Sequence, residues 1–129
     1  MYDKMLIIDG LYDIEEALLH IIKRTSWIKN INDFATTPEG MDILDVATIR
    51  LMAIGEEIKK IDKRTQGQLF VQYPNIDWKN IMELRNFIAH QYFRIDVKVI
   101  FDTVQNRVHP LLTTIQKMIA DLGKEIIIS

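Results

Sequence analysis

Apolar residues recur at intervals of four and three along four stretches of the chain, and this periodicity is its most constraining feature. The most regular stretch runs from residue 97 to residue 122. Its apolar stripe is Val97, Phe101, Val104, Val108, Leu111, Ile115, Met118 and Leu122. Positions spaced in this way lie on one face of an α-helix, and no stretch shows the sustained alternation of a β-strand. The sequence therefore predicts an all-α protein.

The other three stretches carry the same pattern and span residues 7–21, 44–61 and 78–92. The connectors between the four stretches are short, except at residues 26–37 and 65–76. Because the first of these connectors is too apolar for an unpacked loop, we expect another helical turn in it. Amphipathic helices joined by modest connectors predict an up-and-down bundle of four to five helices.

Individual residues predict where helices begin, bend and end. Thr37, followed by a proline and a glutamate, is a helix start signal, and Asp77 is the expected N-cap of the third stretch. Pro110 lies inside the last stripe and leaves the Asn106 carbonyl without its helical donor, so we expect a kinked last helix. The last residues, 125–129, are expected to form a short apolar tail after Gly123 that frays or packs on a neighbour.

Composition narrows the class of protein. The 129 residues are expected to form one domain, residues 1–129, with a core built from a chain that is 48% apolar. There is no cysteine, which excludes disulfides and zinc-cysteine sites. The first residues lack the apolar run of a signal or membrane segment, so we expect a cytoplasmic protein without membrane contact. A net charge of −2 disfavours a broad basic face, so any contact with a nucleic acid must be local.

The densest group of chemically useful side chains lies in the third stretch. Arg85, Asn86, His90 and Tyr92 fall within eight residues, between apolar positions. Five residues along an ideal helix turn the side chain by about 140°, so Arg85 and His90 do not share a face. On spacing alone, a structural role is favoured: a paired arginine, a histidine at a helix C-terminus and a packed tyrosine ring.

Three arrangements could still bring Arg85 and His90 to one site. The arginine could reach across the helix surface, or the helix could loosen near Ala89. Alternatively, two copies of the segment could meet across a dimer axis. Spacing does not decide among these arrangements.

Several spaced motifs resemble one known family. Arg85–Tyr92 resembles the Arg-x4-His-x-Tyr motif of the HepT-like branch of the HEPN proteins. Ile54–Glu57 resembles the family's Ile-Gly-Glu segment, and Tyr73–Trp78 resembles its Tyr-Pro-x-Ile-x-Trp lead-in. Tyr92–Asp96 resembles the turn into the next helix. The resemblance covers roughly residues 45–112, in the family's order.

The resemblance implies a metal-independent endoribonuclease toxin without a cofactor, paired with a small nucleotidyltransferase antitoxin that adds AMP to Tyr92. His90 would act as base or acid. Arg85 would bind phosphate oxygens bidentately. Asn86 would hold a phosphate or orient His90. A symmetric homodimer would bring two motifs together and supply two histidines.

Other residues leave alternatives open. Glu56 is either a cleft residue or part of a solvated face. Arg94 stands where the family commonly has a turn glycine, and Ile49-Arg50 replaces a polar pair. A basic cluster near the end of the second stretch either complements the helix dipole, the favoured interpretation, or binds RNA phosphates or an acidic partner. It comprises Lys59, Lys60, Lys63 and Arg64. The alternative function is a non-catalytic adaptor that binds a nucleotidyltransferase.

Overall fold

The computed structural model describes residues 3–91 and 93–128. Within these ranges the regular elements are all helical, which confirms the predicted all-α class. They are α1 (Lys4–Arg24), α2 (Ile31–Ala35), α3 (Pro38–Arg64), the 3₁₀ turn η1 (Phe70–Gln72), α4 (Trp78–His90), α5 (Val97–Asn106) and α6 (Val108–Ile128).

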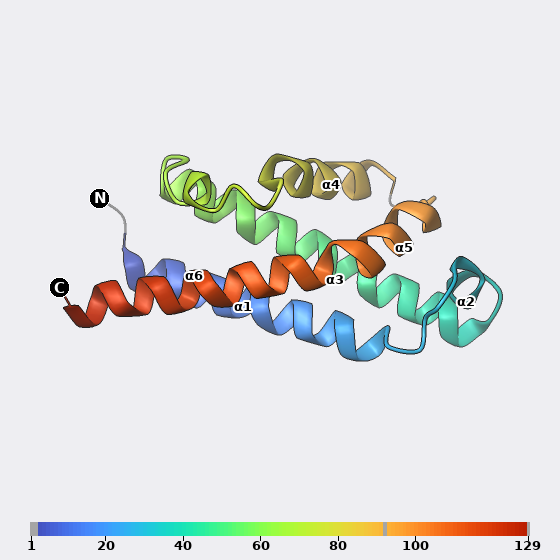
Figure 1. The fold of residues 1–129 in the computed structure, drawn as a ribbon. Coiled ribbons are helices and arrows are strands. Elements are labelled where there is room, and N and C mark those ends of the chain that lie inside the picture. The colour runs from blue at the N-terminus through green and yellow to red at the C-terminus, as the bar shows by residue number, and fades with distance from the viewer. Residues whose placement is uncertain (1–2, 92, 129) are drawn as a thin grey trace.

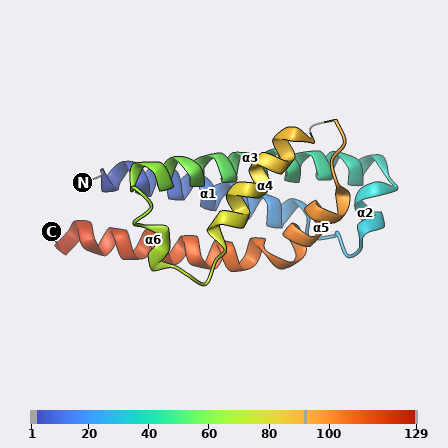
Figure 2. The same cartoon turned by 90° about the horizontal axis from the view of Figure 1, so that it is seen from above.

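Three long helices form the body of the bundle (Figure 1). Helix α1 packs against both α3 and α6, and the three run side by side. Helix α4 packs on α3 and crosses it obliquely, as Figure 2 shows. The short helices α2 and α5 pack together at one end of α3. In the described part of the chain, no helix is both long and apolar enough to span a lipid bilayer.

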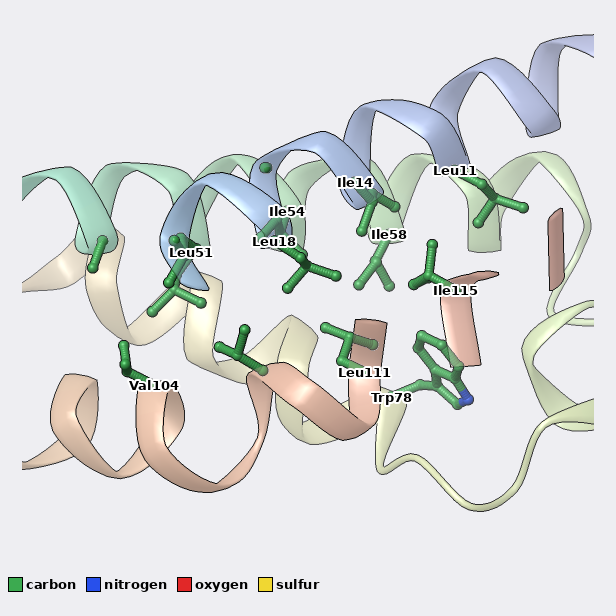
Figure 3. Close-up of a cluster of buried hydrophobic side chains, with 14 of the residues drawn as sticks. Leu11, Ile14, Leu18, Leu51, Ile54, Ile58, Trp78, Val104, Leu111 and Ile115 are labelled. Atoms are coloured by element: carbon green, nitrogen blue, oxygen red, sulfur yellow. The ribbon is translucent and has the colours of Figure 1, made fainter. Parts of the chain in front are cut away.

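The predicted apolar stripes form the core. Leu11, Ile14 and Leu18 of α1 point toward side chains from α3 and α6 (Figure 3). Every stripe position of the first two stretches is buried. Burial of one such large aliphatic side chain stabilises the fold by about 1.5–3 kcal/mol. The periodicity therefore identified the buried faces correctly.

The predicted helix starts are confirmed. The Thr37 hydroxyl accepts a hydrogen bond from the Gly40 N–H at 3.0 Å, and a proline occupies the first position of α3. The Asp77 carboxylate accepts one from the Asn80 N–H at 3.0 Å. The extra helical turn expected in residues 26–37 is α2, which has a capping box with Asn30 as N-cap.

The interruption expected at the Asn106 carbonyl is a break between two helices. Helix α5 ends at Asn106 and α6 begins at Val108, with Arg107 between them. Pro110 is the third residue of α6, where a missing backbone donor costs nothing because the first N–H groups of a helix lack intrahelical partners. This break, together with α2, brings the described chain to six α-helices.

The prediction of a tail after Gly123 is wrong, because α6 continues to Ile128. A glycine inside a helix costs only about 1 kcal/mol relative to alanine. Burial of Met118 and Leu122 on the inner face outweighs that cost. In the same last turns, Glu125 pairs with Lys4 of α1 at 2.9 Å.

The lead-in to α4 is fastened to α6 by polar contacts. The Tyr73 hydroxyl donates to the Asp121 carboxylate at 2.8 Å, and the Trp78 indole N–H donates to the Tyr73 carbonyl at 2.8 Å. Lys117 also binds Asp121, at 2.9 Å. These contacts, first that of Lys117 and then that of Tyr73, hold the pKa of Asp121 below its ordinary value. The start of α4 is therefore fixed relative to the bundle.

Candidate functional site

Helices α3 and α4 come into close contact at Gly55, and this contact positions Arg85. Gly55 is buried in the middle of α3. A Cβ atom at this position would lie 2.5 Å from the Cβ and 3.1 Å from the Cγ of Arg85. Only a residue without a side chain permits this approach. The Gly55 position of the Ile-Gly-Glu segment is thus explained by helix packing.

Replacing Gly55 by alanine should destabilise the protein. The clashing atom is the Cβ of Arg85, which cannot move unless α4 moves with it. Overpacking of this kind costs about 1–3 kcal/mol, more than the gain of up to about 1 kcal/mol in helix propensity. Chemical denaturation should therefore show a lower free energy of unfolding.

Gly123→Ala is the matched control for this prediction. It is also a glycine inside a helix, but a Cβ there would meet nothing within 4 Å. This variant should be more stable than the wild type by about 0.5–1 kcal/mol. Equal effects of the two substitutions would contradict the packing role of Gly55.

The Arg85 side chain is directed from α4 toward α3. Its guanidinium forms an ion pair with the Glu56 carboxylate, and its Nη1 donates to the Asn86 side-chain oxygen at 3.1 Å. The side chain is 29% exposed, so the head group can be reached from solvent. Its Nε atom is buried and has no acceptor among the described residues. Glu56 is therefore the ion-pair partner of Arg85, and its carboxylate is partly exposed to solvent.

A second cation joins this group from α3. The Lys59 ammonium donates to the same Asn86 oxygen at 3.3 Å. Glu56, Lys59, Arg85 and Asn86 thus form one network, which we call the α3–α4 polar cluster. The neighbouring Lys60 instead pairs with Glu57, at 3.8 Å.

His90 lies away from the α3–α4 polar cluster. It is the last residue of α4 and is exposed, and its side chain forms no hydrogen bond to another described residue. Helix α4 is continuous through His90, so the loosening considered near Ala89 is not observed. Arg85 reaches toward α3 and not toward His90. In a single chain, the two residues therefore lie on different faces of α4.

A groove lies between α4 and α5, beside the α4 face that carries Phe87. Phe87, one turn before His90, lines this groove of about 410 Å³. Lys98 and Arg107 contribute basic side chains from the wall opposite α4. The acidic side chains of the groove are Glu83, on α4, and Asp102, on α5. The groove is therefore of mixed charge and does not form a continuous basic surface.

Among the remaining predicted positions, Tyr92 is outside the described residues. Around it, the Arg94 N–H donates to the Gln91 carbonyl at 2.8 Å. Ile49, on α3, lines a pocket of about 280 Å³ that also has Asp45 and Thr48 in its wall. The departure at Ile49 therefore leaves polar groups in this wall.

Lys59 was not singled out by the sequence, which placed it in a cluster of four basic residues. Its spacing of three from Glu56 on α3 was the available signal, because such residues share a helix face. Across residues 3–91 and 93–128, no three His, Asp or Glu side chains are arranged to hold a metal ion.

Comparison with known proteins gives consistent matches. The model of the family described as "Ribonuclease HepT-like" matches residues 14–118. The chain is 31% identical over 116 residues to "Putative RNase MJ0127" of Methanocaldococcus jannaschii, covering 89% of this chain and 88% of the relative. It is 31% identical to "Putative RNase MJ1216" of the same organism over 120 residues, covering 89% of each chain.

A more distant relative comes from a different organism. The chain is 25% identical to "Putative RNase TTE0752" of Caldanaerobacter subterraneus over 100 residues, covering 77% of this chain and 81% of the relative. No solved structure matches the chain at a significant level.

Proposed function

The chain belongs to the HepT-like ribonuclease family, and we propose that Arg85, Asn86 and His90 carry out its RNA cleavage without a metal ion. Family membership confirms the resemblance read from the sequence and the predicted class of enzyme, an endoribonuclease. The observation that supports Arg85 and Asn86 is the orientation of the Arg85 side chain, and His90 is supported by the motif. Glu56 and Asn86 hold the Arg85 guanidinium between α3 and α4, where it is partly exposed to solvent.

The proposed reaction is attack by the RNA 2′-hydroxyl on the adjacent phosphorus. A base removes the hydroxyl proton, the bond to the 5′-oxygen breaks, and an acid protonates that oxygen. The products are a 2′,3′-cyclic phosphate and a 5′-hydroxyl. His90 serves as base or acid, and Arg85 stabilises the negative charge on the phosphate oxygens. Asn86 holds the phosphate or the arginine.

The direct test is digestion of RNA by the purified protein beside its His90→Ala variant. Cleavage by the wild type that is lost in the variant supports the proposal. A wild type that leaves RNA intact but binds a nucleotidyltransferase would favour the adaptor alternative.

The enzyme is proposed to act as a two-fold homodimer. Arg85 and His90 lie on different faces of α4, so a second copy is the simplest way to bring one residue of each kind to a shared phosphate. Apolar side chains near the motif support this arrangement, since Phe87 is 37% exposed and Phe93 is 96% exposed. Burial of both in an interface removes that surface from water.

Analytical ultracentrifugation should therefore give the mass of a dimer at micromolar concentration. Phe87→Asp places a charge at the proposed interface and should shift the protein toward monomer. Leu19→Asp, which alters an exposed apolar residue on α1, is the control and should remain dimeric. A monomeric wild type would contradict the proposed assembly.

The biological setting that we propose is a toxin–antitoxin pair in the cytoplasm, where RNA is available. The partner is a small nucleotidyltransferase, and the control step is transfer of AMP to Tyr92. This part of the proposal is supported by the Arg-x4-His-x-Tyr motif, which the sequence retains in full.

A further inference from the structure

We infer that Lys59 is a phosphate-binding residue that gives the α3–α4 polar cluster its net positive charge and binds the RNA backbone beside Arg85. This inference rests on the proposed function. It concerns a residue outside the Arg-x4-His-x-Tyr motif, on a different helix.

The first observation is the shared hydrogen-bond acceptor. Lys59 Nζ and Arg85 Nη1 donate to the same Asn86 oxygen, at 3.3 Å and 3.1 Å. The two cationic groups are therefore no further apart than two hydrogen-bond lengths. A phosphodiester has two non-bridging oxygens and can accept hydrogen bonds from both cations at once.

The second observation is the charge of the cluster. Glu56 is its only carboxylate and pairs with Arg85. Without Lys59, the remaining three side chains have no net charge, so the cluster attracts an anion more weakly. With Lys59 the cluster carries one positive charge. Because the whole chain has a net charge of −2, this local charge must be supplied by individual side chains at the site.

The third observation separates Lys59 from the other basic residues of α3. Lys60 pairs with Glu57, which lies on the α1 side of α3, where its carboxylate would be 2.5 Å from a Cβ atom on Gly10. Lys63 and Arg64 are in the last turn, where they complement the helix dipole. Of the four, Lys59 is the one whose hydrogen bond leads to α4.

The test is the salt dependence of RNA binding. The probe is a short fluorescein-labelled 2′-O-methyl RNA of mixed sequence, which has the phosphates but no free 2′-hydroxyl for cleavage. Fluorescence anisotropy gives the binding constant at several salt concentrations. Each phosphate contact contributes about 0.7 to the slope of log K against log salt for a single strand. Lys59→Gln should bind more weakly than the wild type, with a slope smaller by about this amount.

Lys60→Gln is the matched control, because it removes the same charge from the adjacent position on the same helix. It should leave the slope at the wild-type value. Lys59→Arg keeps a cation and should restore the slope, which excludes a folding defect at position 59. Equal slopes for wild type, Lys59→Gln and Lys60→Gln, with binding intact, would overturn this inference and leave the proposed function standing.

Failure of the proposed function gives a different result. In that case the wild type neither binds the 2′-O-methyl probe nor cleaves unmodified RNA. Such a result would contradict both the proposed function and the role of Lys59.

Discussion

Replacing His90 by alanine should lower the rate of RNA cleavage by about 10²–10⁴-fold, the usual contribution of a general acid or base. The physical reason is that the 2′-hydroxyl is a weak nucleophile until its proton is removed. His90 is exposed at the end of α4 and its imidazole ring makes no hydrogen bond to the described residues, so the ring is available to substrate. The measurement is the initial rate of cleavage of a labelled RNA.

His109→Ala is the control for this substitution. His109 is also an exposed histidine, but it lies on α6 and not on α3 or α4, the helices that carry the motif and the polar cluster. This variant should cleave RNA at the wild-type rate, and both variants should melt at temperatures close to that of the wild type. A His90→Ala protein with undiminished activity would contradict the assignment of His90 and point to a contaminating nuclease.

The same assay distinguishes the proposed chemistry from metal-assisted hydrolysis. EDTA should leave the wild-type rate unchanged, and the products should end in 2′,3′-cyclic phosphate. Arg85→Lys keeps the positive charge but loses the planar fork that binds two phosphate oxygens, so its activity should also fall. Wild-type activity that disappears with EDTA would contradict the metal-independent mechanism.

Much of the fold was predictable because it depends on local rules. The apolar stripes on α1 and α3 follow from a period of 3.6 residues, and every stripe position in them is buried. The starts of α3 and α4 follow from Thr37 and Asp77, whose side chains bond to backbone N–H groups three residues onward. These signals need only neighbours in the sequence.

The remaining features depend on contacts between segments that are distant in the sequence. The sequence predicts that the helix ends near Gly123, but α6 packs against α1 and continues to Ile128. Nothing near Lys59 in the sequence indicates that its ammonium meets Asn86, which is 27 positions away. The same holds for Gly55, whose lack of a side chain matters only because Arg85 lies against it. The family motifs contain Arg85 and Glu56, but the ion pair between them depends on the packing of α4 on α3 and could not be predicted from the sequence.

Addition of AMP to Tyr92 should abolish RNA cleavage. In this transfer, the phenol oxygen attacks the α-phosphorus of ATP, pyrophosphate leaves, and the phenol loses its proton. The product carries a bulky phosphodiester with a negative charge, two residues past His90 in the sequence. Arg85 is the motif's cation, and a tethered phosphate that binds it competes directly with the RNA phosphate. The protein should gain about 329 Da, the mass of AMP less water, on Tyr92.

Two phenylalanine variants make the test specific. Tyr92→Phe keeps the ring but removes the acceptor oxygen, so it should remain unmodified and active after incubation with the nucleotidyltransferase and ATP. Tyr12→Phe, which alters an exposed tyrosine on α1, should still be modified and silenced. Mass spectrometry and the cleavage assay are run on the same samples. An adduct undiminished in Tyr92→Phe would show that another residue accepts AMP. Modified wild type that cleaves at the unmodified rate would refute the competition for Arg85, because a phosphate bound there cannot leave the site open to RNA.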